Sequence, residues 1–251
     1  MRLTIRSRAL ATALTVVAAL APASPALASS LAASPAAASP AAASAGFSAG
    51  DAGLRVMPLG DSITFGKGDP SENGYRAALR AWLDPPVEFV GSQVNGATAH
   101  EGHPGWRIAQ LTERIDGWMA GSRPDVVLLD IGTNDLLHHD HIDQAPDRLA
   151  ELIDHIVAAN PEVRILLAEL LVVDRGHEAD FAWYNSTLPV VAALYPDNVT
   201  LVDMARVPVA NTVDHVHPNE LGYRQMAYQW YEALRGVLPQ GRDLSPVTSP
   251  F

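Results

Sequence analysis

Five short runs of predominantly apolar residues, rich in Val, Ile and Leu, recur along the chain. None of them alternates regularly between apolar and polar positions. Such runs are typical of strands that are buried on both faces of a parallel sheet. The predicted strands are Val56–Leu59, Val87–Val90, Val126–Ile131, Val163–Leu171 and Val199–Val202.

Segments with helical spacing of apolar residues lie between and after these runs. In residues 73–84, for example, Leu79, Trp82 and Leu83 fall on one face of a helix. Strand and helix alternate five times, which predicts an α/β domain with a five-stranded parallel sheet and right-handed crossovers. Ligands of such sheets bind outside the carboxyl ends of the strands, so residues that directly follow strands are candidates for function. The predicted helices lie within residues 73–84, 105–119, 145–161, 180–194 and 219–238.

Polar residues suited to nucleophilic catalysis follow three of the predicted strands. Ser62 follows the first strand, and the motif GTND, residues 132–135, follows the third. Asp214 and His217 come after the fifth strand, on a turn that enters the last helix. A serine hydroxyl becomes a nucleophile when a histidine takes its proton and a carboxylate orients that histidine. The three strand ends therefore predict acyl transfer through Ser62.

Each of these motifs also has an ordinary structural interpretation. Gly-Asp-Ser is a common turn composition. Asn134 and Asp135 suit the start of a helix, and Asn219 suits the cap of the last helix. The presence of all three motifs at strand ends favours one catalytic site over three unrelated turns.

The first 50 residues differ in composition from the rest of the chain. Three arginines precede an uncharged apolar run and an Ala-x-Ala sequence that ends at Ala28. This pattern predicts a secretory signal peptide over residues 1–28 and an extracellular location, because the run is too short to span a membrane. Residues 29–50 are nearly all Ala, Ser and Pro, which predicts a disordered spacer. Residues 239–251 are expected to form a loose tail, which leaves residues 51–238 as a single domain.

Charge and cysteine content narrow the classes of partner. The chain has a net charge of −11 at pH 7, and loss of the three arginines of the signal peptide would bring it to −14. An acidic surface repels nucleic acid and anionic membranes, so we expect neither as a partner and predict a neutral substrate. The chain contains no cysteine, which excludes disulfide bonds, a cysteine nucleophile and thiolate metal ligands.

Three motifs resemble those of the SGNH (GDSL-type) serine hydrolases: GDSITFG from Gly60, GTND from Gly132 and DHVHPNELGY from Asp214. Other segments, including NGYRAAL, EGHPGWRI and PDVVLLDIGTNDLL, are similar to family 3 of the carbohydrate esterases, a group with acetylxylan esterases. The likeness covers residues 55 to about 234. It implies the flavodoxin-like SGNH fold, a three-layer sandwich. The Gly-x-Ser-x-Gly elbow of the α/β-hydrolases is absent around Ser62.

The resemblance also implies a role for each matching residue. Ser62 would be the nucleophile, His217 the general base and then acid, and Asp214 the carboxylate that orients the imidazole. His215 could serve as the base instead, but the Asp-x-x-His spacing favours His217.

The same resemblance implies an oxyanion hole made by the backbone N–H groups of Ser62 and Gly105 and the side-chain amide of Asn134. Gly105 stands at the start of the predicted helix 105–119, where N–H groups lack helical partners. Gly91, after the second strand, is the alternative backbone donor.

A histidine-rich loop, residues 138–141, invites interpretation as a metal site. Adjacent loop residues rarely converge on one ion, and no second cluster offers matching helical ligand spacing. We therefore expect a polar loop, with no metal and no cofactor. Asp61 and Asp135 are expected to be structural hydrogen-bond acceptors. Trp106 is expected to form an apolar wall, a sugar-stacking surface or part of the core.

These observations predict a secreted serine esterase that hydrolyses acetyl or other short-chain acyl esters through an acyl-enzyme at Ser62. The substrate that the resemblance implies is an acetylated plant polysaccharide such as acetylxylan, because the fold by itself supports many esters. An extracellular lipase or lysophospholipase-like esterase is the first alternative, and it would need a wide apolar rim. A non-catalytic carbohydrate-binding protein is the second, and it leaves the serine, histidine and aspartate unexplained.

Overall fold

The computed structural model describes residues 53–83, 87–96, 98–171, 176–238 and 247–251. The predicted signal peptide and spacer, residues 1–28 and 29–50, lie outside the described residues, as do residues 239–246 of the predicted tail. Among the helices that are described, none has the length and apolarity needed to cross a membrane.

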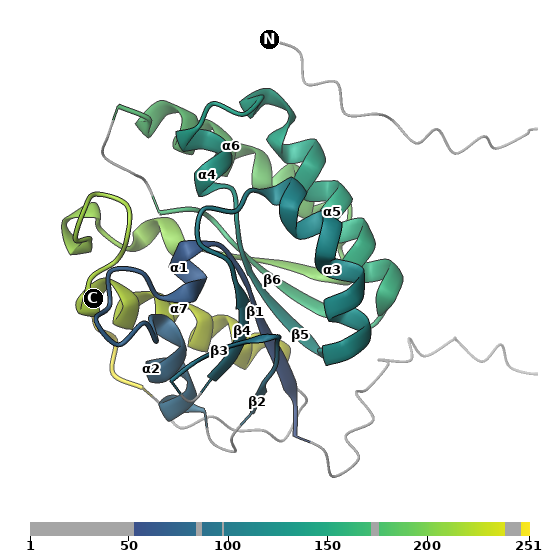
Figure 1. Ribbon diagram of the computed structural model, residues 1–251, viewed down its shortest axis with the longest axis horizontal. Helices are drawn as coiled ribbons and strands as arrows, with labels where there is room; N and C mark the ends of the chain where they lie inside the picture. The colour runs from purple at the N-terminus through teal and green to yellow at the C-terminus, as the bar shows by residue number, and fades with distance from the viewer. Residues whose placement is uncertain (1–52, 84–86, 97, 172–175, 239–246) are drawn as a thin grey trace, which may run out of the picture. The chain divides into compact units, whose positions relative to one another are not determined.

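A seven-stranded, mostly parallel sheet forms the centre of the described domain (Figure 1). Its strand order is β3-β4-β1-β5-β6-β7, and β2 pairs with the first residues of β1 on the same side as β4. All pairs are parallel except β3 with β4, which is antiparallel. The strands are β1 (Arg55–Gly60), β2 (Glu88–Phe89), β3 (Gln93–Asn95), β4 (Thr98–Gly102), β5 (Val126–Asp130), β6 (Arg164–Ala168) and β7 (Val199–Val202).

Helices cover both faces of this sheet and make the three-layer sandwich that the resemblance implies (Figure 1). On one face α3 packs against α5 and α5 against α6, while on the other α2 packs against α7. The short helices α1 and α4 directly follow β1 and β5. The α-helices are α1 (Ser62–Phe65), α2 (Tyr75–Trp82), α3 (Ile108–Ser122), α4 (Thr133–Leu137), α5 (Ala145–Ala159), α6 (Glu178–Ala192) and α7 (Glu220–Val237); the 3₁₀ helices are Ile142–Gln144, Met204–Arg206 and Val209–Asn211.

The predicted α/β class with a parallel sheet is confirmed, but the predicted count of five strands is wrong. The sequence of β4, TAHEG, is polar, so a search for apolar runs does not find it. Its buried Glu101 is satisfied by hydrogen bonds from the backbone N–H and hydroxyl of Ser92, and by the ring of His103. Polar residues can therefore occupy a buried strand here because hydrogen-bond partners outside the strand compensate them.

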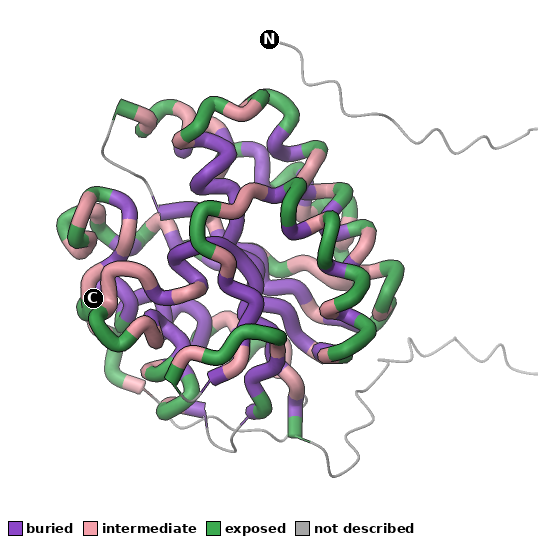
Figure 2. Tube along the Cα trace, in the orientation of Figure 1, coloured by how far each residue is buried: buried purple, intermediate pink, exposed green. Residues whose placement is uncertain are grey.

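Burial follows the layers closely (Figure 2). Every residue of β5 is buried, as are all residues of β1 after Arg55. This explains why these strands read as continuous apolar runs.

The last residues of the chain, 247–251, contact α7. The Gln225 amide donates to the Pro250 carbonyl at 3.3 Å, and the Phe251 ring meets Tyr228 edge-on.

Candidate active site

Ser62 stands on a sharp connection between β1 and α1. A Cβ on Gly60 would lie 2.1 Å from the carbonyl oxygen of Asp130 on the neighbouring strand, so only glycine fits there. Asp61 then caps α1, because its Oδ1 accepts a hydrogen bond from the Ile63 N–H at 2.9 Å. Gly60 and Asp61 are thus both required by the local geometry of the turn, and the turn places Ser62 at the carboxyl end of β1.

The structure brings Ser62, His217 and Asp214 into one chain of hydrogen bonds. The Ser62 Oγ lies 2.9 Å from the Nε2 of His217, although 155 residues separate them in the sequence. The Nδ1 of His217 lies 2.8 Å from Asp214 Oδ2. His217, and not His215, is therefore the imidazole that meets the serine.

Asp214 is held as a carboxylate. Burial alone would raise its pKa, but hydrogen bonds from the His217 backbone N–H, the His217 ring and the Val216 N–H lower the pKa of Asp214 below its usual value. A carboxylate only accepts hydrogen bonds, so the proton on the ring resides on Nδ1. The Nε2 of His217 is then free to accept the hydroxyl proton of Ser62.

Asn134 and Gly105 lie on segments that contact each other beside this chain. The Asn134 amide, in the first turn of α4, donates to the Trp106 carbonyl at 2.9 Å and to Asp61 Oδ2 at 3.3 Å. Gly105 has φ +80°, and a Cβ added there would meet nothing within 4 Å. Within the described residues, neither the Gly105 N–H nor the Ser62 N–H donates a hydrogen bond.

Gly91, the alternative to Gly105, has a different environment. A Cβ at Gly91 would lie 2.4 Å from the carbonyl carbon and oxygen of His100 in β4. This glycine therefore permits a close backbone approach within the sheet. By contrast, Trp106, which follows Gly105, accepts a hydrogen bond from the Asn134 amide at its carbonyl oxygen.

Three buried carboxyl groups lie under the candidate site. Burial, together with the charge of Asp135, raises the pKa of Asp61 to about 7, although the Ile63 N–H opposes this shift. Burial and the charge of Asp61 raise the pKa of Asp130 well above its usual value. Asp130 Oδ2 has no hydrogen-bond partner among the described residues. A protonated carboxyl is the form that such an apolar setting favours.

Asp135, in α4, links the start of α3 to α5. Its Oδ2 accepts from the Ile108 N–H at 3.1 Å, and its Oδ1 pairs with the Arg148 guanidinium at 2.8 Å. Burial raises the pKa of Asp135, while Arg148 and Ile108 lower it in part. Asp61 and Asp135 thus act as the structural acceptors that the sequence predicts.

Arg76 is a supporting residue that sequence analysis does not single out. This fully buried guanidinium makes five hydrogen bonds, four to carbonyl oxygens and one to a hydroxyl, and two of the carbonyls belong to α1. Burial lowers the pKa of Arg76 from its usual value. The sequence does contain a signal for this burial. Arg76 stands three and seven residues before the buried Leu79 and Leu83, so helical spacing places its cation on the apolar face of α2. The accepting residues are Thr64, Phe65, Glu72 and Thr98.

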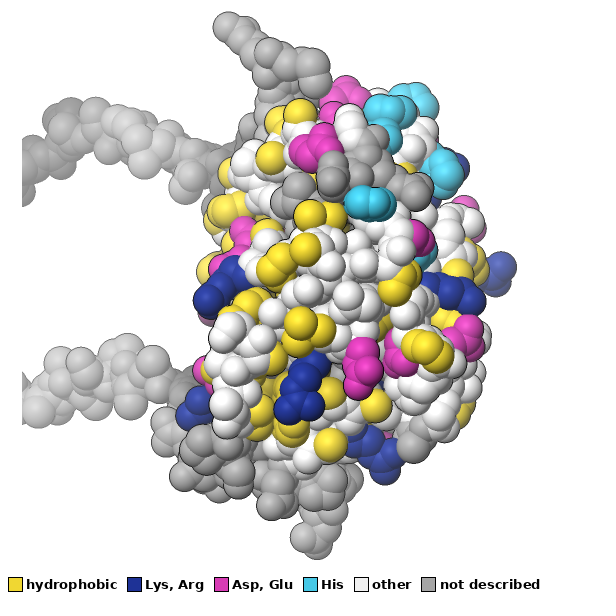
Figure 3. Space-filling view, turned by 90° about the vertical axis from the view of Figure 1, so that its left-hand side faces the viewer, with side chains coloured by type: hydrophobic (Ala, Val, Ile, Leu, Met, Phe, Trp, Pro, Cys, Tyr) yellow, Lys and Arg dark blue, Asp and Glu magenta, His cyan; other side chains and the backbone are white. Residues whose placement is uncertain are grey.

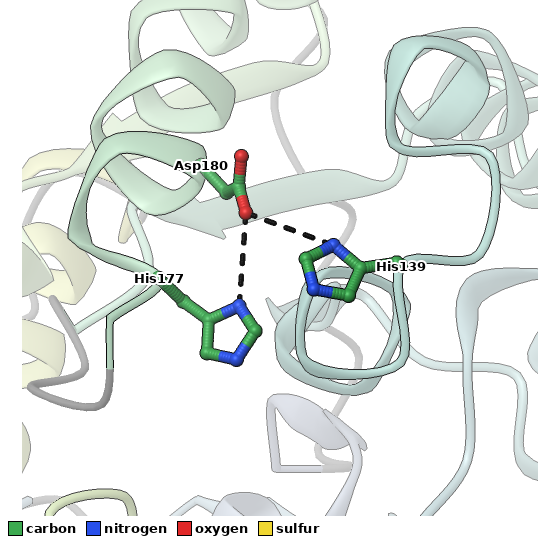
Figure 4. A group of neighbouring side chains, drawn as sticks. All are labelled: His139, His177 and Asp180. Atoms are coloured by element: carbon green, nitrogen blue, oxygen red, sulfur yellow. Dashed lines mark ion pairs between the residues drawn. The ribbon is translucent and has the colours of Figure 1, made fainter.

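The histidine-rich loop lies close to the start of α6 (Figure 4). His139 Nδ1 is 3.9 Å from Asp180 Oδ2, and His177 Nδ1 is 3.6 Å from the same oxygen. The premise that no second cluster has helical ligand spacing is therefore wrong, because His177 and Asp180 stand three residues apart in the first turn of α6. The sequence H-x-x-D at the beginning of a helix was the missed signal.

The sequence and the fold were compared with those of known proteins, and both match esterases. Residues 59–225 match the model of the GDSL-like Lipase/Acylhydrolase family. A multidomain esterase from Ruminococcus flavefaciens is 31% identical over 226 residues, which is 74% of this chain and 29% of that protein. The chain thus spans less than a third of the length of this curated relative.

Two solved carbohydrate esterases have a similar fold. A family 3 carbohydrate esterase from Clostridium thermocellum is 30% identical, with a TM-score of 0.66 over 73% of this chain and 96% of that one. A family 3 carbohydrate esterase from Talaromyces cellulolyticus is 26% identical, with a TM-score of 0.63 over 73% of this chain and 97% of that one.

Proposed function

The chain belongs to the GDSL-like lipase/acylhydrolase family, and on that premise we propose that it is a secreted serine esterase that removes acetyl groups from plant polysaccharide such as acetylxylan. The observation that carries the proposal is the hydrogen-bonded chain from Ser62 through His217 to Asp214, with distances of 2.9 and 2.8 Å. Proton transfer from serine to imidazole requires contacts of this length. No cofactor or metal takes part in the proposed reaction.

In the first half of the reaction, His217 Nε2 takes the hydroxyl proton of Ser62 as Oγ attacks the ester carbonyl carbon. Asp214 stabilises the imidazolium that forms. The carbonyl oxygen becomes an oxyanion, and collapse of the tetrahedral intermediate breaks the bond to the sugar oxygen. His217 returns the proton to that oxygen, which leaves as a free sugar hydroxyl.

The second half repeats these steps with water. His217 takes a proton from water, the resulting hydroxide attacks the acetyl carbon bound to Ser62, and acetate departs while the proton returns to Ser62 Oγ. The serine is regenerated, and the net change is ester plus water to alcohol plus acetic acid.

The oxyanion would be held by the N–H groups of Ser62 and Gly105 and by the Asn134 amide. Two of these donors have no partner among the described residues, so they are available without rearrangement. The Asn134 amide is already engaged twice, and its longer bond, 3.3 Å to Asp61, is the one that an oxyanion would replace. Contact between Asn134 and Trp106 favours Gly105 over Gly91 as the second backbone donor.

The polysaccharide substrate rests on the relatives and on the chemistry of the surface. Two of the similar solved structures are named as carbohydrate esterases. Trp106 stacks on His103 with ring centroids 4.2 Å apart, next to Gly105, and remains partly exposed. Such a ring offers a flat surface to a sugar. The signal-peptide composition of residues 1–28 supports export, which a polymer substrate would require.

A lipase or lysophospholipase-like activity is the competing proposal, and the surface disfavours it. On the face that Figure 3 shows, hydrophobic side chains are interspersed with charged and polar ones. The large hydrophobic side chains that are most exposed come from five parts of the chain, with only Val190 and Leu194 near each other at the end of α6, which does not amount to the continuous apolar rim that long acyl chains need. They are Val94, Val190, Leu194, Val213, Leu221 and Phe251.

The test is acetate release from acetylated xylan by the purified chain, alongside nitrophenyl acetate and octanoate. We expect acetate release and turnover of the acetate ester above that of the octanoate ester. The reverse chain-length preference would support the lipase alternative, and no hydrolysis of any ester would support a non-catalytic binding protein.

Ser62→Ala should lower kcat by about 10⁴-fold or more while the circular dichroism spectrum stays unchanged. Ser186→Ala is the matched control, because this exposed serine on α6 bonds only its own helix, at the Trp183 carbonyl. Substantial turnover by Ser62→Ala would remove the nucleophile from the proposal and leave the family assignment intact.

A further inference from the structure

We propose that His139, His177 and Asp180 form a binding site for a divalent transition-metal ion of the Zn²⁺ type. The three side chains come from two segments, the loop that follows α4 and the first turn of α6, and they point toward one another (Figure 4). None of them belongs to the chain of hydrogen bonds from Ser62 to Asp214.

The separation of the ligand atoms fits a shared ion. One nitrogen or oxygen from each side chain lies within 4.8 Å of the other two, and the two His–Asp distances are 3.6 and 3.9 Å. Two ligands on one tetrahedral Zn²⁺, each bound at about 2.0–2.1 Å, stand roughly 3.4 Å apart. Both His–Asp distances exceed hydrogen-bond length and are close to the separation that a common ion would give. Rotamer adjustments that also bring together the two imidazole nitrogens, now within 4.8 Å of each other, would complete the site.

The second observation is an unsatisfied buried atom. His177 Nδ1 is shielded from solvent and has no hydrogen-bond partner among the described residues. His177 also occupies the N-cap position of α6 without making a side-chain capping bond. A buried ring nitrogen without a partner is uncommon and costs free energy. An ion bound at Nδ1 gives this atom the partner that the protein does not supply.

The ligand types select the class of ion. Two imidazoles and one carboxylate suit Zn²⁺ and its transition-metal neighbours, whereas Ca²⁺ and Mg²⁺ prefer oxygen ligands alone. The neighbouring Asp140 is not available as a further ligand, because its carboxylate already pairs with Arg107 at 2.9 Å and with His141 at 3.1 Å. Three protein ligands leave a fourth position for water.

An ion at this place would tie together two segments that border the candidate active site. The loop that bears His139 directly follows α4, which carries Asn134. The helix α6 carries Tyr184, whose hydroxyl donates to the Ile131 carbonyl at 3.2 Å, and Asn185, which exchanges two hydrogen bonds of 2.8 Å with the Leu170 backbone. The ion would therefore stabilise the fold near the site, and the proposed ester chemistry would run without it.

Isothermal titration of Zn²⁺ into the full chain, produced without a polyhistidine tag and dialysed against a chelator, tests the site. We expect saturable binding of one equivalent, and no binding of Ca²⁺ or Mg²⁺. His177→Ala and Asp180→Asn should each weaken Zn²⁺ binding by about tenfold or more, since each removes a ligand. His155→Ala is the matched control, because His155 also faces a single carboxylate, Asp116, at 2.9 Å, and this variant should bind as the wild type does.

The proposal is overturned if Zn²⁺ does not bind saturably, or if His177→Ala and Asp180→Asn bind it as tightly as the wild type. A second readout is the thermal unfolding midpoint. Zn²⁺ at the same concentration should raise it by a few degrees in the wild type and in His155→Ala, and by clearly less in Asp180→Asn. An equal rise in Asp180→Asn would place the ion elsewhere and contradict the site.

Discussion

The two faces of the sheet are covered by different kinds of buried side chain. Under α3, α5 and α6 the core consists of hydrophobic side chains, among them Leu111, Leu152 and Leu188. Under α2 and α7, the largest fully buried side chains include Arg76, Tyr75 and Trp230, and the side chains of Thr64 and Thr98 are buried near them. One face is thus an apolar core, and the other contains a hydrogen-bonded polar network.

The polar network is directed at one short segment, the helix that begins with Ser62. Arg76 bonds the carbonyls of Thr64 and Phe65, and the hydroxyl of Tyr223 bonds the carbonyls of Ile63 and Lys67. A helix of four residues has too few internal hydrogen bonds to keep its shape alone. Donors from α2 and α7 satisfy its free carbonyls and thereby fix its direction.

This difference indicates a division of labour. Apolar burial is non-directional and stabilises the fold as a whole. Buried hydrogen bonds contribute less net free energy, but they fix geometry because each one requires a particular distance and angle. The apolar face should therefore govern stability, and the polar face should govern both stability and turnover.

The largest effect should come from Arg76→Met. This change keeps the apolar stem and removes all five hydrogen bonds. The carbonyls of Thr64 and Thr98 lose this donor, and those of Phe65 and Glu72 keep only long contacts of 3.4 and 3.5 Å with the Asn95 amide. We expect a loss of about 4 kcal/mol in the free energy of unfolding, measured with urea, because each orphaned buried group costs about 1–3 kcal/mol. The kcat of the folded variant on a nitrophenyl ester should fall by about tenfold or more, as a small misplacement of a nucleophile is costly.

Arg76→Lys separates charge from geometry in the same position. A lysine keeps the cation but has one donor group in place of the planar guanidinium, so it cannot reach all of the carbonyls at once. It should recover little of the stability or the turnover. Full activity in both variants would show that the polar face does not position Ser62.

Leu152→Ala probes the apolar face. Leu152 is fully buried on α5 within the hydrophobic core, and its loss should cost about 3 kcal/mol in unfolding free energy through lost burial and a cavity. At temperatures where the variant remains folded, its kcat should match the wild type. A drop in kcat as large as that of Arg76→Met would erase the distinction between the faces.

The same distinction explains how much could be predicted from the sequence. Val126–Ile131 was found as a strand because burial on both faces excludes polar residues, and that exclusion can be read from the pattern. The edge strand Val199–Val202 was found from its β-branched residues, although only Val202 in it is buried. Ser62, Asp214 and His217 attracted attention because they follow strands, and their catalytic roles remain a prediction.

Features built from long-range compensation were not predictable in this way. The strand β4 has a polar sequence because Glu101 is satisfied by Ser92, nine residues away. Arg76 can be buried because carbonyl groups of three separate segments accept hydrogen bonds from its guanidinium. The neighbours His139 and His177 are 38 positions apart, and only the packing of the α4 loop against α6 brings them together. Hydropathy patterns record burial, whereas these residues depend on which partner the fold supplies.

The buried carboxyl beside the nucleophile gives a pH-dependent effect on stability. The pKa of Asp61 is raised from 3.8 to about 7, so the folded state holds a proton that the unfolded state releases above about pH 4. The stability that Asp61 contributes is therefore complete below about pH 4 and is lost as pH rises to about 7. Relative to the wild type, Asp61→Asn should gain on the order of 4 kcal/mol of unfolding free energy over this range.

Urea unfolding of the wild type and of Asp61→Asn at several pH values measures this difference. The lost acceptor for Asn134 costs the variant the same free energy at every pH, so it cancels from the trend. Glu151→Gln, at an exposed position on α5, is the control and should follow the wild-type curve. A constant difference between the wild type and Asp61→Asn would mean that Asp61 is ionised throughout.

The smallest effect should come from Tyr223→Phe, which removes one hydroxyl from the polar face and leaves the ring in place. That hydroxyl lies 2.5 Å from the Lys67 carbonyl and 3.2 Å from the Ile63 carbonyl, on either side of the end of α1. Its loss should cost about 1 kcal/mol in unfolding free energy. Because this variant loosens α1 without creating a cavity, its kcat should fall by a few-fold. Leu152→Ala should lose about three times as much unfolding free energy, yet its kcat should not change. Tyr228→Phe makes the same change on the same helix, where the ring meets Phe251, and it should leave kcat unchanged. Equal kcat values for the two tyrosine variants would show that Arg76 alone is sufficient to hold the helix of Ser62.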